Sequence, residues 1–227
     1  DRSSTTLTIS DLFVIAEQLG CVWKLEKLCR NKALKAAVAK PEKVKLFLNV
    51  DGNIIQDKAF IQGFTNRKAI KAGVPASDIV FEITERSDIE NYQILQQIMK
   101  HYADQGYEIA LDDVGAGHSG LNRVVNTTPD YLKADIELVR DIHKYKKKEI
   151  MMKLLLDYCN ATGAILIAEG IETAEELECL HSLGVHYGQG FFLGKPERAF
   201  ENVSDEAAEI LERLNGKENI LFLGRRT

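Results

Sequence analysis

The sequence of 227 residues has few cysteines, no excess of positive charge and no long apolar run. Its four cysteines (Cys21, Cys29, Cys159 and Cys179) form no Cys-x-x-Cys pair, which disfavours a zinc site or a disulfide framework. A net charge of −5 argues against binding long nucleic acid through a basic surface. No stretch reaches the roughly 18 apolar residues of a membrane helix, and no secretory signal is recognisable. We therefore expect a cytoplasmic protein without a membrane segment.

The chain alternates strand-like and helical segments. With 45% hydrophobic and 28% charged residues it has the composition of a globular protein. The helical pattern predicts helices that include one capped by Ser10, one from residues 57 to 72 and one capped by Thr173. Six strand-like runs lie between such segments: 45–50, 79–84, 108–113, 131–135, 164–170 and 187–192. This alternation indicates a parallel α/β fold, either a doubly wound sheet or an eight-fold barrel.

Polar residues interrupt these runs close to their carboxyl ends. A doubly wound sheet gathers its site at one switch point, whereas a barrel collects residues from the ends of many strands. Polar residues at six successive strand ends therefore favour the barrel. They are Asn49, Glu82, Asp112, Asp113, Lys133, Glu169 and Gln189.

The glycine-rich loop at residues 115–120 matches the dinucleotide-binding pattern Gly-x-Gly-x-x-Gly, with Asp135 in the range of its ribose-binding acid. That motif requires a whole crossover helix after the third glycine. Only ten residues, Pro129 among them, separate Gly120 from the strand at Tyr131. This is short of the roughly 10–12 or more residues of a whole crossover, so we disfavour a dinucleotide site.

A metal site accounts for more of the strand-end residues. Asn49, Glu82, Asp112 and Asp113 offer hard oxygen ligands, which suit Mg²⁺ or Mn²⁺. Two such ions about 3.5–4 Å apart promote in-line attack on a phosphodiester. Lys133 can hold the attacking water, or deprotonate it if its surroundings lower its pKa. Any one of these residues taken alone also fits a strand-end cap or a salt bridge.

Six motifs, in order from about Thr8 to Pro196, together resemble the EAL-domain cyclic-di-GMP phosphodiesterases of bacteria. They are Phe47-Leu-Asn-Val50, Phe81-Glu-Ile-Thr-Glu85, Asp112-Asp-Val-Gly-Ala-Gly-His-Ser119, Tyr131-Leu-Lys-Ala-Asp135, Ala168-Glu-Gly-Ile-Glu-Thr173 and Gln189-Gly-Phe-Phe-Leu-Gly-Lys-Pro196. The resemblance implies a (β/α)₈ barrel of the TIM type that binds two ions, Mg²⁺ or Mn²⁺. It implies hydrolysis of one phosphodiester of cyclic-di-GMP to give linear 5′-pGpG.

The resemblance also implies roles for individual residues. Four residues would bind metal: Asn49, Glu82 and Asp112 as ligands, with Asp113 serving the second ion. Lys133 would position or activate the water, and Glu169 and Gln189 would complete the site. Other roles lie in the loops: Glu85 would clamp the glycine loop with support from Glu172, and the weaker ligand-binding candidates are Arg2, Asp135 and His118.

The sequence departs from the family pattern in one important respect. The glutamate of the family's Glu-Ala-Leu tripeptide, itself a metal ligand, is not in this sequence. We expect it, with the first two barrel strands, just before residue 1 in the parent protein. Residues 1–200 would then be an incomplete barrel domain, and residues 201–227 a helix with an apolar tail that forms a last strand or begins another domain. The departure leaves a second hypothesis open, a non-catalytic receptor for cyclic-di-GMP.

Three substitutions in the glycine loop are milder departures: Val114 stands for the usual phenylalanine, His118 for a tyrosine and Gly120 for a serine. They bear more on loop coupling than on metal binding. The resemblance further implies a homodimer and regulatory or sensory domains in the parent protein.

Overall fold

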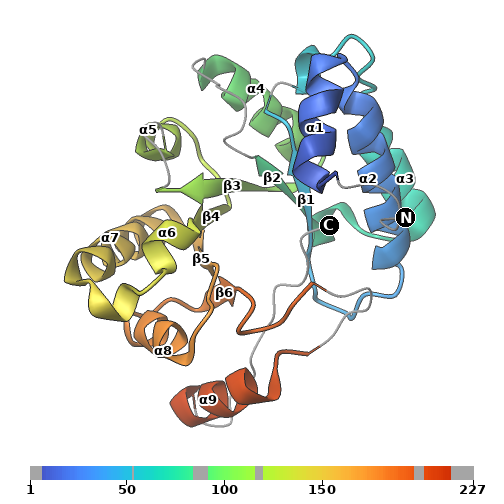
Figure 1. The fold of residues 1–227 in the computed structure, drawn as a ribbon. Helices are drawn as coiled ribbons and strands as arrows, with labels where there is room; N and C mark the ends of the chain where they lie inside the picture. The colour runs from blue at the N-terminus through green and yellow to red at the C-terminus, as the bar shows by residue number, and fades with distance from the viewer. Residues whose placement is uncertain (1–6, 53, 84–91, 116–119, 197–201, 216–227) are drawn as a thin grey trace.

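The computed structural model describes residues 7–52, 54–83, 92–115, 120–196 and 202–215. Within them, six parallel strands form one sheet in the order β1-β2-β3-β4-β5-β6 (Figure 1). Because the order never reverses, the sheet has no switch point, and it is a partial (β/α)₈ barrel as the strand-end residues predicted. The strands are β1 (Leu46–Val50), β2 (Ile79–Ile83), β3 (Glu108–Val114), β4 (Tyr131–Ala134), β5 (Ile165–Glu169) and β6 (Tyr187–Gln189).

Helices pack on the outer face of this sheet (Figure 1). The α-helices are α1 (Ile9–Gln18), α2 (Val22–Ala37), α3 (Phe64–Ala72), α4 (Tyr92–Ala103), α5 (Gly120–Val125), α6 (Ile136–Val139), α7 (Lys146–Thr162), α8 (Ala174–Ser182) and α9 (Asp205–Asn215). Three 3₁₀ turns accompany them: η1 (Ile54–Gln56), η2 (Ala76–Asp78) and η3 (Ile142–Lys144). No helix in these described ranges is long and apolar enough to cross a membrane.

Two predicted helix starts were wrong. Thr8, not Ser10, caps α1, because its hydroxyl accepts the Asp11 amide while the Asp11 carboxylate accepts the Thr8 amide. The helix expected from residue 57 begins only at Phe64, after Gly63 in the left-handed region at φ 68°. The capping box of Thr173 at the start of α8 is confirmed.

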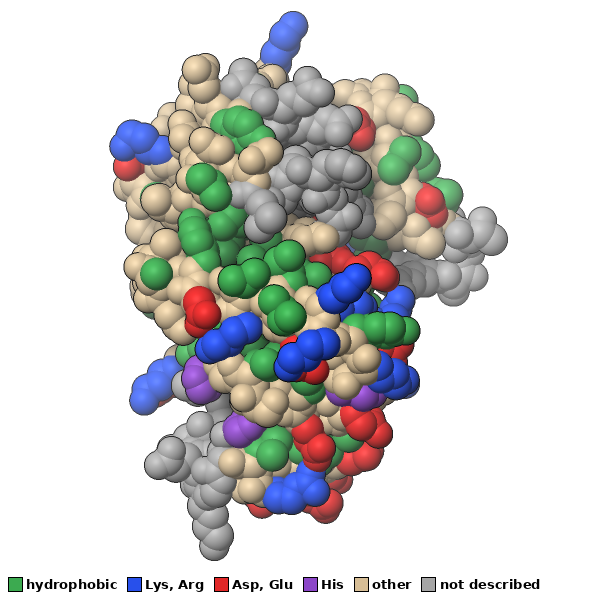
Figure 2. Space-filling model, turned by 90° about the vertical axis from the view of Figure 1, so that its left-hand side faces the viewer, with side chains coloured by type: hydrophobic (Ala, Val, Ile, Leu, Met, Phe, Trp, Pro, Cys, Tyr) green, Lys and Arg blue, Asp and Glu red, His purple; other side chains and the backbone are tan. Residues whose placement is uncertain are grey.

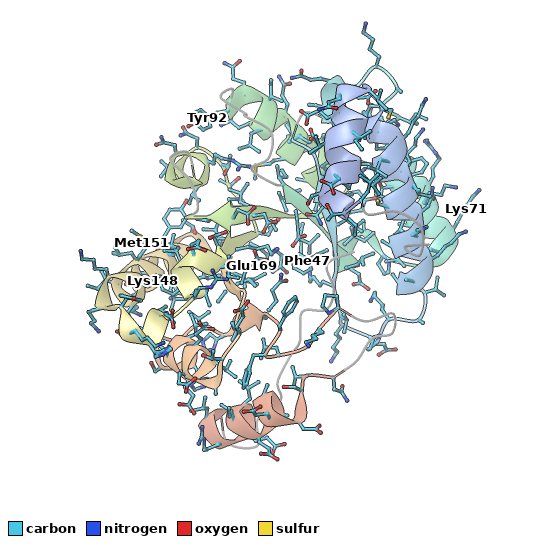
Figure 3. The ribbon with its side chains drawn as sticks, in the orientation of Figure 1. Phe47, Lys71, Tyr92, Lys148, Met151 and Glu169 are labelled. Carbon is cyan, nitrogen blue, oxygen red and sulfur yellow. The ribbon has the colours of Figure 1, made fainter. Side chains whose placement is uncertain are left out.

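The inner face of the sheet has two layers, because side chains on alternate strand positions point to the same face. Toward the amino ends of the strands it carries an apolar cluster formed by Phe47, Val80, Ala110, Tyr131 and Ile167. Two positions further along each strand, the same face carries polar residues. The inner face is thus apolar toward the amino ends of the strands and polar at their carboxyl ends. Phe47 of the apolar layer and Glu169 of the polar layer are both labelled in Figure 3.

The last described helix, α9, belongs to the main core. Ala207 and Leu211 are buried there, and Arg213 pairs with Glu178 of α8. The predicted boundary at residue 201 stays a prediction. The apolar tail after Asn215 lies outside the described residues, as do Arg2, Glu85 and His118.

Candidate metal centre at the strand ends

A buried lysine lies at the centre of the polar layer. Lys133 of β4 is 1% exposed, and its ammonium pairs with Glu82 Oε1 at 2.5 Å and with Asp112 Oδ1 at 2.9 Å. Glu169 of β5 is its third carboxylate partner. All three carboxylates are buried too, so strands β2, β3, β4 and β5 are joined through one cation.

These charges fix the protonation state of the lysine. Burial alone would lower the pKa of Lys133, but the carboxylates of Glu82, Asp112 and Glu169 outweigh burial and raise that pKa above its ordinary value. The side chain is therefore an ammonium at neutral pH. Of its two predicted roles, this charge state favours holding a water over deprotonating it.

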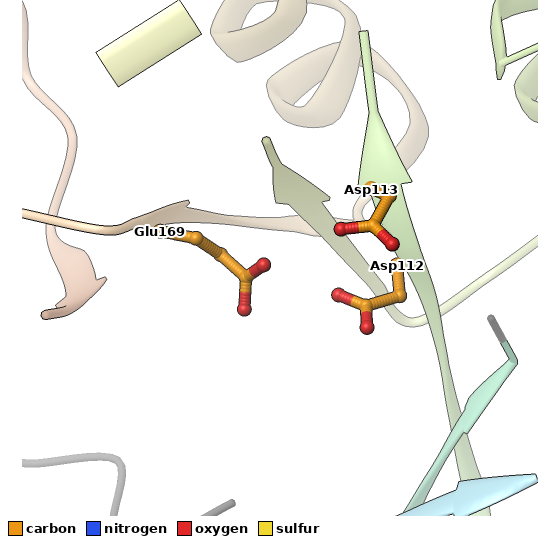
Figure 4. Close-up of side chains that lie close together, drawn as sticks. All are labelled: Asp112, Asp113 and Glu169. Carbon is orange, nitrogen blue, oxygen red and sulfur yellow. The ribbon is translucent and has the colours of Figure 1, made fainter. Parts of the chain in front are cut away.

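The adjacent aspartates reach the same site because β3 is irregular. Neighbouring residues on a regular strand point to opposite faces, so Asp113 should point away from Asp112. The β3–β4 register shifts between Leu111 and Val114, and Asp113 adopts a left-handed backbone at φ 56°. Carboxylate oxygens of Asp112, Asp113 and Glu169 consequently lie within 4.8 Å of one another (Figure 4). A bulge of this kind re-aims a side chain next to a site.

Asn49 and Gln189 extend the polar layer along the strand ends. In the β1–β2 register Asn49 lies opposite Glu82, and in the β5–β6 register Gln189 lies opposite Glu169. Both residues are half-buried. The structure thus brings the predicted strand-end residues together on one face.

Close backbone packing supports the strand ends. At Gly115, φ is 107° and an added Cβ would lie 2.5 Å from Leu138 Cδ1. At Gly190, directly after β6, an added Cβ would lie 2.1 Å from the carbonyl oxygen of Ile171. Only glycine fits these two positions, which hold the segments after Asp113 and Gln189 close to their neighbours.

The ligand-binding candidate Asp135 and the loop-support candidate Glu172 both have structural partners. The Asp135 carboxylate caps α6 by accepting the Glu137 amide at 2.7 Å. The Glu172 backbone amide donates to Glu176 Oε2 at 2.8 Å. Glu176 is 2% exposed and also accepts the amides of Thr173 and Asp141, so it joins two loops. The capping-box pattern predicted the contact with Thr173 but gave no signal for the contact with Asp141.

The donor set fits divalent cations. Glu82, Asp112 and Glu169 pair with the Lys133 ammonium, and Asp113 brings a further carboxylate within 4.8 Å of those of Asp112 and Glu169. Buried carboxylates need a compensating cation, proton or donor. Carboxylate and amide oxygens are the ligands that Mg²⁺ and Mn²⁺ prefer. The residues present therefore fit the ions that the sequence predicted.

Parallel strands in an order that never reverses, with chemistry-bearing side chains at their carboxyl ends, indicate a partial barrel of the TIM class. The sequence profile of the EAL domain matches residues 2–196. The chain therefore belongs to the EAL domain family.

Two of the curated relatives are described as cyclic di-GMP phosphodiesterases. Cyclic di-GMP phosphodiesterase PdeA of Borreliella burgdorferi is 26% identical over 200 residues, which cover 87% of this chain and 30% of that protein. Cyclic di-GMP phosphodiesterase PdeB of Shewanella oneidensis is 27% identical over 150 residues, 66% of this chain and 17% of that protein. The chain thus spans less than a third of either relative.

Solved structures of similar fold contain ligands. A standalone EAL protein of Vibrio cholerae in its c-di-GMP bound form has a TM-score of 0.73 at 28% identity, covering 82% of this chain and 78% of the other. BlrP1 of Klebsiella pneumoniae in a manganese/cy-diGMP complex has a TM-score of 0.77 at 27% identity, covering 86% of this chain and 50% of the other.

Proposed function

We propose that this chain is a two-metal phosphodiesterase that hydrolyses cyclic-di-GMP to linear 5′-pGpG. The observation that carries the proposal is the convergence of Asp112, Asp113 and Glu169 beside Lys133 and Glu82 in a member of the EAL domain family. Relatives named as cyclic di-GMP phosphodiesterases supply the substrate class. An acidic cluster repels a phosphodiester unless cations lie between them, so cleavage of this substrate at the cluster calls for bound metal ions.

Each strand-end residue has a role in this proposal that follows from its position. Asn49, Glu82 and Asp112 would hold one ion, and Asp113, re-aimed by the bulge in β3, would serve the second. Bound ions would lower the pKa of a coordinated water and stabilise charge that builds on the phosphate. Glu169 and Gln189, opposite each other on β5 and β6, would complete the metal and water site.

Lys133 acts as a fixed donor in this proposal. Its ammonium has three protons to donate, and the raised pKa keeps all three in place at neutral pH. Glu82, Asp112 and Glu169 take up these protons, so an ion bound to one of those carboxylates would free a proton of the lysine to orient a water. Its three carboxylate partners in turn keep the ammonium at the mouth of β4.

The test is turnover. The protein is incubated with cyclic-di-GMP and Mg²⁺ or Mn²⁺, products are separated by chromatography, and ligand binding is measured by calorimetry. We expect pGpG to form only with the divalent ion. Tight binding without turnover would refute the enzyme and support the second candidate.

That second candidate is a receptor that binds cyclic-di-GMP without cleaving it. The printed sequence contains no Glu-Ala-Leu tripeptide, so one family metal ligand is not among its residues. In addition, Lys133 already neutralises part of the carboxylate charge that would attract ions. Calorimetry with ligand in the presence of a chelator separates the two: a receptor of this kind binds without metal.

We further propose a homodimer and additional regulatory domains in the parent protein. Helices α5 and α7, joined by the bond from Tyr158 Oη to the Val124 carbonyl, expose Val125, Ile150 and Leu154, each more than half exposed. Figure 2 shows apolar side chains gathered on the face that carries these helices. An exposed apolar patch of this kind favours a protein partner. The greater length of the relatives supports further domains, and sedimentation tests the dimer.

A further inference from the structure

Helix α2 carries an ion pair on its buried face. Glu26 and Arg30 are 3% and 2% exposed and pair with each other one helical turn apart. They lie in the stripe that otherwise buries Trp23, Ala33 and Leu34. Charged residues are almost never fully buried unless they are paired, and a pair here costs desolvation that an apolar pair would not. The pair therefore calls for an explanation beyond packing.

Arg30 is enclosed by aromatic rings and one hydroxyl. Its guanidinium carbon lies 5.1 Å from the ring centre of Trp23 and 5.2 Å from that of Phe81, and Nη1 donates to Thr65 Oγ1 at 3.2 Å. Phe81 directly precedes Glu82 on β2. The arginine is thus fixed between α2, α3 and β2, where it can hold a carboxylate in a single orientation.

The carboxylate so held is bonded to the end of β1. Glu26 Oε2 pairs with Arg30, while Oε1 accepts the backbone amide of Asp51 at 2.7 Å. Asp51 immediately follows β1, and Asn49 lies two residues before it on the inner face. A second bond, from the Trp23 amide to Asp57 Oδ2 at 3.3 Å, ties the same connection to α2.

We propose that Glu26 is a positioning residue for the metal centre: held by Arg30, it anchors the Asp51 amide and so fixes the strand end that presents Asn49. The inference rests on the proposed function, because it assigns Asn49 to an ion. Groups that orient metal ligands from outside typically change metal affinity by about 10–100-fold when removed. Glu26 reaches its ligand through the backbone and touches no reacting atom.

The test compares two double variants that differ in one acceptor atom. In E26M/R30M both charges are replaced by apolar side chains of similar length, a change that buried ion pairs often tolerate. In E26Q/R30M the charges are also gone, but the side-chain carbonyl of the introduced glutamine can still accept the Asp51 amide. Mn²⁺ affinity is measured by calorimetry, and hydrogen exchange of the Asp51 amide reports the anchoring bond directly.

We expect E26M/R30M to bind Mn²⁺ about 10–100-fold more weakly than wild type, with faster exchange at Asp51, and E26Q/R30M to recover most of both losses. A purely structural role would lower the melting temperature without separating the two variants. Equal Mn²⁺ affinity in wild type and E26M/R30M would overturn the positioning role and leave the proposed function standing. Absence of Mn²⁺ binding in the wild type would overturn both.

A second variant tests the same bond from its other side. Asp51→Pro removes the donating amide proton and leaves the Glu26–Arg30 pair unchanged. It should weaken Mn²⁺ binding as E26M/R30M does, and it covers the case in which that double variant does not fold. Wild-type Mn²⁺ affinity in folded Asp51→Pro would contradict the inference.

Discussion

Replacing Lys133 by methionine tests the charge balance of the site most severely. The side chain keeps its length and loses its ammonium, so the buried carboxylates of Glu82, Asp112 and Glu169 lose their shared partner. Divalent ions can then supply the missing positive charge. We therefore expect Lys133→Met to be much less stable than wild type in a chelator and to regain stability when Mn²⁺ is added.

The size of the effect follows from burial. Removing one member of a buried ion pair costs about 3–5 kcal/mol in the free energy of unfolding. For a chain of this length each kcal/mol lowers the melting temperature by about 2–4 °C, so the loss should be about 6–20 °C. Mn²⁺ at 100 times its dissociation constant adds about 2.7 kcal/mol. The ion should stabilise the variant more than the wild type, because no ammonium competes for the carboxylates.

Thermal unfolding in chelator and in Mn²⁺ measures both quantities. Lys153→Met is the matched control, since Lys153 is an exposed lysine of α7 that pairs only at the surface with Asp157. Its stability should stay within about 0.5 kcal/mol of wild type. A melting temperature for Lys133→Met equal to that of the control in chelator, or no greater gain with Mn²⁺, would refute the reasoning.

Two further substitutions test catalysis and pH dependence. Asp112→Asn keeps the shape of the side chain and removes a charge from the ion site, so turnover of cyclic-di-GMP should fall by more than the roughly 10–100-fold of an outer-shell loss. The melting temperature should fall less than in Lys133→Met, because Glu82 and Glu169 still pair with Lys133. Wild-type turnover would exclude Asp112 from the site. Burial and the neighbouring Tyr102 raise the pKa of Tyr107 to about 12, whereas an unfolded chain releases this proton near pH 10. Its contribution is therefore intact below about pH 10 and is lost as pH rises toward 12, at up to about 1.4 kcal/mol per pH unit. Tyr107→Phe should flatten this part of the stability profile in chemical denaturation, and an unchanged slope would contradict the assignment.

The strand-end residues could be predicted because parallel strands place their carboxyl ends on one edge. Asn49, Glu82, Asp112 and Lys133 each interrupt an apolar run, and alternation along a strand then fixes the face that they share. The same alternation predicts that Asp113 should point away from the site. Its position depends on a register shift against β4, a tertiary feature without a local sequence signal.

The helical layer was harder to predict for a similar reason. Residues 57–63 have helical composition, but Asp57 uses its carboxylate on the amides of Trp23 and Ala59, so α3 starts at Phe64. The Glu26–Arg30 pair could have been predicted from the sequence, because two opposite charges four residues apart fall within the apolar stripe of a helix. Its bond to Asp51 spans 25 residues of sequence and required the structure.

The most direct test of a two-metal phosphodiesterase is a single-turnover experiment with protein in excess over cyclic-di-GMP. The nucleotide is recovered after mixing with Mn²⁺ or with a chelator, and pGpG is quantified by chromatography. We predict complete conversion to pGpG with Mn²⁺ and none with the chelator. Recovery of intact cyclic-di-GMP from a protein that binds both the nucleotide and Mn²⁺ would contradict the account.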